Sequence, residues 1–238
     1  MPIKGLVSRQ PKTSSCREII TSFWALAIQQ GEEAAKALQS LPGIQGTVST
    51  TQIDVTNDQS VDEAAARIAS QYGRLDVLIN NAAITGKLTN PPHRSSFRQV
   101  LEVNVVGAMS TTEAFLDLLR KSSEPRLVFV SSSTGSITHA ADPSSPYYNP
   151  QGMEYRTSKT ALNMLMVMCN ARLKGEGFKV FGADPGLCAT NLTGDAESLR
   201  KRNAAEPSDG GLRVSAVVKG EKDADVGKIL GVYGVAQF

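Results

Sequence analysis

Histidine and cysteine are scarce in this chain, which has only two histidines, His93 and His139, in 238 residues. So few imidazoles exclude a metal site built on a histidine cluster, and they leave a Ser-His-Asp triad poorly supplied. The three cysteines, Cys16, Cys169 and Cys188, show no C-x-x-C spacing, and their odd number does not suggest a disulfide framework. We therefore expect a reducing compartment, the cytoplasm.

Long apolar runs and a strong net charge are also missing. No apolar run reaches the roughly 18 residues that a membrane helix needs, and the polar residues that follow the start of the chain do not resemble a signal peptide. The formal net charge of +2 gives no argument for nucleic acid or an anionic membrane as a partner. With 41% hydrophobic and 20% charged residues, the chain is expected to form one globular domain, 1–238.

Strands and helices are predicted to alternate along most of the chain, because apolar β-branched runs alternate with segments of helical periodicity. The expected strands cover 47–55, 75–79, 126–130, 178–183 and, at the end of the chain, 227–235. The expected helices cover 32–40, 58–72, 97–119 and 154–173. This alternation indicates βαβ units and a Rossmann-like, doubly wound parallel sheet of the α/β class.

The two ends of the chain do not follow this alternation. Within the atypical segment 1–31, residues 17–30 are predicted to be helical, with apolar residues on more than one face. Residues 194–225 look polar and flexible. We therefore divide the expected domain into the segment 1–31, a Rossmann core over 32–193, and a substrate loop with a C-terminal strand over 194–238.

Tyr155 and Lys159 stand four residues apart near the start of the predicted helix 154–173. At this spacing two side chains share one face of a helix, so the phenol and the ammonium would lie side by side. A neighbouring cation favours the phenolate and lowers the pKa of a tyrosine from its usual value of about 10. The pair therefore predicts a tyrosine that exchanges a proton near neutral pH, although the same spacing is also common on ordinary helix faces.

Other distinctive residues gather where predicted strands end, which is the edge of a parallel sheet at which ligands bind. They are Asp54, Asn80-Asn81, Ser132 and Pro185-Gly186. Plainer interpretations stay open: Asp54 and Pro185-Gly186 are also suited to turns, the serines 131–133 to a polar strand end, and Asn104 to a buried asparagine that bonds to backbone. Their shared position is what favours a site.

These residues resemble the motif set of the classical short-chain dehydrogenase/reductase family, and in particular its carbonyl-reductase-like members. The matching motifs, in the family's order, are Asp54, N-N-A-A at Asn80–Ala83, Asn104 in V-N-V-V-G, Ser132 in V-S-S-S-T-G, Y-x-x-x-K at Tyr155 and Lys159, and P-G-x-x-x-T at Pro185–Thr190. The resemblance covers residues 32 to about 194. It implies an oxidoreductase that transfers hydride between a nicotinamide cofactor and a small-molecule carbonyl or alcohol, with no nucleic acid or membrane as partner.

The resemblance also implies a role for each residue. Tyr155 would protonate the carbonyl oxygen, Ser132 would donate a hydrogen bond to it, and Lys159 would lower the phenol pKa and bind the nicotinamide ribose. Asn104 would hold a water that links Lys159 to solvent. The residues implied to contact the cofactor, NADP(H) in preference to NAD(H), are Asp54, Val55, Asn80, Asn81, Ala82, Tyr155, Lys159, Pro185, Gly186, Leu187 and Thr190.

One departure from the family pattern concerns the cofactor phosphates. The glycine loop T-G-x-x-x-G-x-G, whose backbone N–H groups meet the pyrophosphate, has no counterpart before Asp54, and the second strand that would precede the residue separating NAD from NADP is not recognisable. We therefore expect the fold to lack one or two N-terminal elements and the chain to bind its cofactor weakly. A truncated, non-catalytic relative that acts as a binding protein is the alternative.

A second departure is the separation of Ser132 from Tyr155 by 23 residues, which exceeds the usual family spacing because of the segment 136–152. Members with such an insertion resemble monomeric carbonyl reductases, since the loop can cover the helix face used for dimerisation. A monomer is therefore favoured over a homodimer. Tyr147 and Tyr148 are expected to border the substrate pocket, whose sequence carries no readable code for the substrate.

Overall fold

The computed structural model of the chain describes residues 19–21, 28–40, 42, 46–86, 93–193 and 195–237. In this part of the chain the strands form one sheet in the order β1-β2-β3-β4-β5-β6. They are β1 Ile19–Thr21, β2 Val77–Asn80, β3 Arg126–Val130, β4 Lys179–Ala183, β5 Ile229–Gly231 and β6 Gly234–Val235. Strands β1 to β5 are parallel, and β6 turns back antiparallel to β5.

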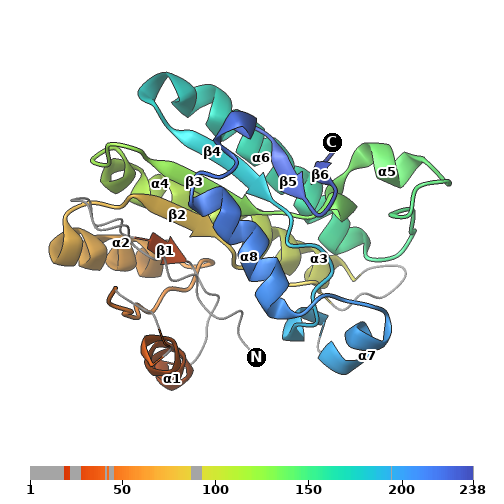
Figure 1. The fold of residues 1–238 in the computed structure, drawn as a ribbon, viewed down its shortest axis with the longest axis horizontal. Coiled ribbons are helices and arrows are strands. Elements are labelled where there is room, and N and C mark those ends of the chain that lie inside the picture. The colour runs from red at the N-terminus through yellow and green to blue at the C-terminus, as the bar shows by residue number, and fades with distance from the viewer. Residues whose placement is uncertain are drawn as a thin grey trace.

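Helices flank this sheet on both faces (Figure 1). They are α1 Ile28–Gln39, α2 Asp58–Tyr72, α3 Arg94–Leu101, α4 Gly107–Leu119, α5 Ile137–Ala141, α6 Met153–Leu173, α7 Ala196–Lys201 and α8 Pro207–Val218. Figure 1 shows α8 crossing one face of the sheet, with α4 and α6 behind the strands. The predicted Rossmann-like α/β sheet is confirmed. None of the described helices is both long and apolar enough to span a membrane.

Two cores form because successive residues of a strand point to opposite faces of the sheet. Leu78 and Leu127 pack on one side with residues of α2, α4 and α6. Val77 and Val128 point to the other side and pack in the cluster that contains Val214 of α8. Strands β2 and β3 are buried along their whole length, which explains why their sequences are continuous apolar runs.

Helix α2 has the bounds that the sequence predicts, 58–72. The side chain of Asn57 caps its first turn by accepting a hydrogen bond from the N–H of Ser60 at 3.0 Å. Gly73 ends it with a φ of 75°, a left-handed conformation that glycine adopts without steric penalty. Helix α6 agrees with the predicted 154–173 within one residue, and β3 has the predicted bounds.

The N-terminal third departs from the prediction in two places. A helix is predicted over 17–30, but Ile19–Thr21 forms β1 beside β2, and α1 begins at Ile28. A strand is predicted over 47–55, but this segment pairs with no strand among the described residues. Ile53 and Val55 are nevertheless buried in the core that includes α2 and α4. A high strand propensity means that the side chains pack well on a half-buried surface. Forming a strand also requires a neighbouring strand with which the backbone can pair.

The C-terminal part is more ordered than the sequence suggests. Residues 194–225 look flexible, yet they contain the helices α7 and α8. The predicted single strand 227–235 is a hairpin of β5 and β6. The expected loss of N-terminal elements falls largely on residues outside the described part of the chain, and the division into 1–31, 32–193 and 194–238 stays a prediction.

Candidate active site

The carboxyl ends of β2, β3 and β4 lie at one edge of the sheet because these strands are parallel neighbours. The turn after β3 packs closely on α6 at this edge. A Cβ on Gly135 would lie 2.8 Å from the backbone carbonyl carbon of Lys159, and the Thr160 hydroxyl donates to the Gly135 carbonyl oxygen at 2.8 Å. The close approach of glycine to the helix therefore sets the distance between the β3 turn and the first turns of α6.

Ser132 and Tyr155 are brought together by this packing, and the Ser132 hydroxyl is near enough to the phenol to lower its pKa. Ser132 begins the short turn Ser133–Gly135. Its hydroxyl oxygen accepts from the N–H of Thr134 at 3.2 Å and lies 2.9 Å from the Thr134 hydroxyl oxygen. Both residues are partly exposed as a whole, and they stand at the edge of the sheet where the sequence predicts the substrate.

The serines on either side of Ser132 are engaged elsewhere. The buried Ser131 donates to the side-chain oxygen of Asn163 on α6. Ser133, also buried, donates to the carboxylate of Asp184. Of the three consecutive serines, only Ser132 has its hydroxyl beside Tyr155, which agrees with the assignment made from the family spacing.

Lys159 is 2% exposed and donates from Nζ to the carbonyl oxygen of Val130 at 2.7 Å. Burial lowers its pKa to about 8, because desolvation disfavours the ammonium, and the negative charge of Asp184 opposes this shift. Nζ lies 5.5 Å from the centroid of the Tyr155 ring. The pair thus shares one helix face, as its spacing predicts.

The predicted lowering of the Tyr155 pKa is not found. Burial of the phenol raises its pKa above the ordinary value, the Asp184 carboxylate raises it further, and the nearby Ser132 hydroxyl opposes both effects. Lys159 does not offset them, because with a pKa of about 8 it loses its charge before the phenol ionises. Tyr155 is therefore set up to hold its proton.

Asn104 lies in a π-helical turn, Glu102–Val106, between α3 and α4. Turns of this type often occur at functional sites. Its side chain is 1% exposed and makes three bonds: with the N–H of Ile84 at 2.8 Å, the carbonyl oxygen of Ile84 at 2.9 Å and the hydroxyl of Ser158 at 2.9 Å. These contacts show the buried asparagine that bonds to backbone, and both of its N–H groups are used. The predicted water on Asn104 stays a prediction.

The residues implied to contact adenosine occupy the ends of two segments. Asp54 forms a turn, since its Oδ1 accepts from the N–H and the hydroxyl of Thr56 at 3.0 and 2.8 Å. Val55 is buried against the start of α4. Asn80 donates to the Thr112 hydroxyl at 2.9 Å, whereas its buried Oδ1 has no partner. Asn81 and Ala82 follow it and are partly buried.

The loop after β4, Pro185–Thr190, is held on two sides. Gly186 has a φ of 77°, and a Cβ there would lie 2.6 Å from Val232. Leu187 is exposed, but its carbonyl accepts from Ala205 at 2.9 Å. A contact of the Thr85 hydroxyl with the carbonyl of Leu192 at 3.3 Å brings the loop after β2 to the same place. The sequence therefore assigns both loops to one edge correctly.

The sequence reading assigned no role to Asp184 and Arg213. Asp184 is buried and stands immediately before the Pro185-Gly186 turn. Arg213 on α8 donates to the Pro185 carbonyl oxygen. Asp184 was visible as an acid at a strand end next to a turn, but the sequence carries no signal that pairs it with Ser133.

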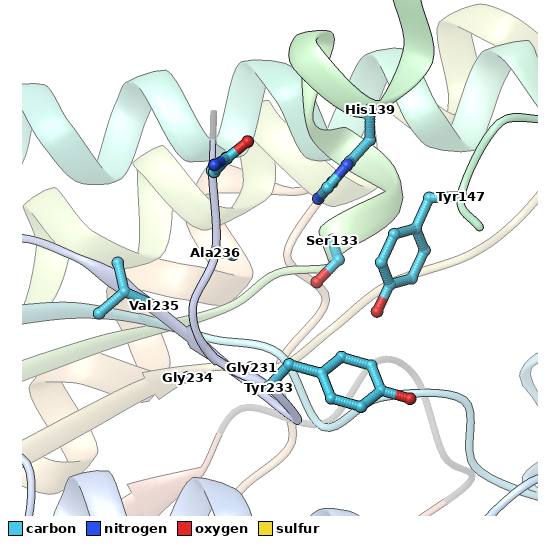
Figure 2. Close-up of a pocket in the computed structure, with 9 residues that line it drawn as sticks. Ser133, His139, Tyr147, Gly231, Tyr233, Gly234, Val235 and Ala236 are labelled. Carbon is cyan, nitrogen blue, oxygen red and sulfur yellow. The ribbon is translucent and has the colours of Figure 1, made fainter. Parts of the chain in front are cut away.

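A pocket of about 190 Å³ opens beside the Ser132 turn. Its described walls come from the 136–152 insertion and the β5–β6 hairpin, and they include Ser133, His139, Tyr147 and Tyr233. Figure 2 shows the His139 and Tyr147 rings projecting toward the hairpin on the side of Ser133. These two rings are 5.0 Å apart. Tyr147 therefore borders a pocket, whereas Tyr148 is not among the described residues that line it.

Comparison with known proteins gives sequence relatives over most of the chain. A family model described as short chain dehydrogenase matches residues 15–201. Short-chain dehydrogenase/reductase tropE of Talaromyces stipitatus is 36% identical over 221 residues, which cover 84% of this chain and 80% of that protein. Short-chain dehydrogenase/reductase eupG of a Phoma species is 35% identical over 221 residues, which cover 82% and 78%.

Solved structures give the same architecture. The crystal structure of NADPH bound carbonyl reductase from chicken fatty liver superimposes with a TM-score of 0.74 and covers 92% of this chain and 87% of that one. Because the two sequences are only 23% identical, this structural similarity shows that the two proteins share a fold and nothing further.

Proposed function

The chain belongs to the short-chain dehydrogenase family, and on this premise we propose that it is a carbonyl-reductase-like, NAD(P)(H)-dependent oxidoreductase. It reduces a small-molecule carbonyl, or oxidises the corresponding alcohol, with Tyr155 as the acid and base. The observation that carries the proposal is the packing of the β3 turn on α6 at Gly135, which brings Ser132 beside Tyr155, with Lys159 Nζ 5.5 Å from the centroid of the phenol ring.

Tyr155 and Ser132 serve the same oxygen in this proposal. A nicotinamide bound at this site would supply hydride to the carbonyl carbon, so that negative charge would develop on the carbonyl oxygen. Two hydroxyl donors fixed in advance stabilise that charge, and the phenol then gives its proton to the oxygen. Because burial and Asp184 raise the pKa of Tyr155, the phenol keeps its proton until the oxygen becomes basic. This favours the reductive direction.

Lys159 contributes a cation that moves little, because it is buried and bonded to the Val130 carbonyl. Its pKa of about 8 gives a pH dependence. A lysine is cationic below its pKa, so we expect the rate of reduction to fall as the pH rises through about 8. Initial rates measured across this range at saturating cofactor check the expectation, and a rate that rises through the same range contradicts it.

The residues present fit the nicotinamide end of the cofactor. The loop Pro185–Thr190 presents a glycine with left-handed φ at Gly186, where a Cβ would lie 2.6 Å from Val232. Toward the adenosine, Asn80 has a buried acceptor without a partner. For the phosphates, the segment 22–27 between β1 and α1 reads Ser-Phe-Trp-Ala-Leu-Ala and contains no glycine. The chain therefore does not offer the family's glycine-rich phosphate loop there.

NADPH binding is accordingly expected to be weak, with a Kd well above the micromolar range, because backbone donors in a glycine loop supply much of the affinity for the pyrophosphate. Titration of NADPH fluorescence with the full chain measures this, and a parallel titration with NADH tests the proposed preference for NADP(H). The chicken enzyme in the comparison is NADPH bound, which supports that preference. A micromolar Kd would contradict the prediction.

A panel of aldehydes and ketones tests the function itself. We expect NADPH oxidation that depends on both the carbonyl compound and the protein. Absence of turnover with every compound at millimolar NADPH would instead favour a non-catalytic relative.

We further propose that the protein is cytoplasmic, since Cys169 and Cys188 are free thiols. We also propose that it is a monomer, since the 136–152 insertion lies beside α6, where the Tyr147 carbonyl accepts from Arg156 at 3.0 Å. A stable dimer on light scattering would argue against the monomer.

A further inference from the structure

Asp184 is a buried carboxylate at the carboxyl end of β4, with 5% of its surface exposed. Its Oδ2 accepts hydrogen bonds from the backbone N–H and the hydroxyl of Ser133, at 2.7 and 2.5 Å. Its Oδ1 accepts from the N–H of Gly186 at 2.8 Å. One side chain therefore joins the turn after β3 to the turn after β4, although Ser133 and Asp184 are 51 positions apart in the sequence.

The main chain holds this carboxylate in place. The backbone N–H of Asp184 donates to the carbonyl oxygen of Leu230 on β5 at 2.8 Å. Ser131, at the end of β3, bonds through its own N–H to Ala183 at 2.8 Å. The backbone on either side of the contact, at Asp184 and at Ser131, is thus bonded to neighbouring strands. The Asp184 carboxylate therefore holds the Ser132 turn and the Pro185-Gly186 turn at defined positions relative to the sheet.

We propose that Asp184 is a positioning residue of the active site, which holds the Ser132 turn against the Pro185-Gly186 turn and places a fixed negative charge beside Tyr155 and Lys159. The proposal rests on the function proposed above, in which Ser132 and Tyr155 serve one oxygen. It goes beyond that function because none of the motifs that identify the family includes this carboxylate.

The backbone geometry brings this charge near Lys159, because Lys159 bonds to the carbonyl oxygen of Val130 and Val130 pairs with Ala183, the residue before Asp184. The titratable and charged groups around Asp184 are Tyr155 and Lys159 on α6, Cys188 in the following loop and Arg213 on α8. Asp184 raises the pKa of both Tyr155 and Lys159. A negative neighbour favours the protonated form of each group, so Asp184 keeps the phenol protonated and the ammonium charged, which is the state that reduction needs.

Asparagine separates this role from that of an ordinary loop anchor. It has nearly the same shape, but it carries no charge, and its amide offers one acceptor and one donor where the carboxylate offers two acceptors. One of the two loops therefore loses its acceptor, and the charge disappears. If Asp184 were only an anchor, its replacement would change stability and leave the titration of Lys159 unchanged.

The experiment is a pH titration of Lys159 by NMR on ¹³C-lysine-labelled protein, with Lys159→Met to assign the signal. In the wild type we expect a midpoint near about 8. In Asp184→Asn we expect the midpoint to fall by on the order of one pH unit, whereas Asp117→Asn, which removes a 90% exposed carboxylate from the end of α4, leaves it unchanged. An unchanged midpoint in folded Asp184→Asn overturns the proposal.

Two further measurements complete the test. Asp184→Glu keeps the charge but lengthens the side chain, so we expect the Lys159 midpoint to stay within a few tenths of a unit of the wild type while kcat falls by about 10²-fold through misplacement of Ser132. A Glu variant whose Lys159 midpoint falls as it does in Asp184→Asn also overturns the charge role, including where the Asn variant fails to fold. Because the NMR titration needs no turnover, a wild type that oxidises no NADPH would sink the proposed function without deciding the role of Asp184.

Discussion

Replacement of Tyr155 by phenylalanine should reduce the rate of NADPH-dependent carbonyl reduction by about 10²- to 10⁴-fold, the range of a positioned acid. The substitution removes one oxygen atom, which is the proton donor that the mechanism aims at the carbonyl oxygen and which lies near the Ser132 hydroxyl. The ring stays in place on α6, so the fold should be retained. Initial rates of NADPH oxidation, with circular dichroism as a check on folding, measure the effect.

Tyr72→Phe is the matched control for this experiment. Tyr72 ends α2 and its hydroxyl lies 2.8 Å from that of Ser49, away from the sheet edge that carries the site. The same chemical change at Tyr72 should leave the rate within about twofold of the wild-type rate, since substitutions remote from the site have small effects. Activity that survives Tyr155→Phe would discredit Tyr155 as the acid, whatever the control shows.

Removal of the Asp223 carboxylate should cost about 3 kcal/mol of the free energy of unfolding, because it leaves a buried guanidinium without its counter-ion. Arg126 on β3 is 2% exposed, and it meets Asp223 with Nη1–Oδ1 and Nη2–Oδ2 distances of 2.6 and 3.2 Å. Lys179 on β4 bonds to the same carboxylate at 2.6 Å. We place the value at the low end of the usual range because Asp223 is 33% exposed and Arg126 keeps its bond to the Val217 carbonyl.

Chemical denaturation of Asp223→Ala measures this loss, and Asp225→Ala is its control. Asp225 pairs with Lys228 at 2.9 Å, but the lysine side chain is 49% exposed, so the pair should contribute less than about 1 kcal/mol. Equal losses in the two variants would contradict the prediction. The hydrogen bond from Arg126 lowers the pKa of Asp223. The stabilisation is therefore present above the ordinary carboxyl pKa and is lost as the pH falls through the lowered one.

Elements specified by local signals were predictable from the sequence. Helix α2 follows its periodicity between the Asn57 cap and Gly73, and β3 follows its apolar run. The failures need information from elsewhere in the chain. Residues 47–55 have the composition of a strand but no strand beside them in the described part of the chain. Helix α8 was missed because it begins within a polar stretch. Its capping box, Glu206 and Asp209, differs from the usual Ser/Thr and Glu/Gln signature.

The sequence by itself determined the family, the strand-end positions of the proposed site residues and the pairing of Tyr155 with Lys159 on one helix face, because these depend on motifs and on spacing within single elements. Only the tertiary structure decided the direction in which each pKa of that pair shifts. The spacing predicts a lowered phenol pKa, yet the fold buries Lys159 against Val130 and brings Asp184 from another strand, so the phenol pKa rises. Desolvation and contacts between strands depend on how distant segments pack, and sequence spacing carries no record of them.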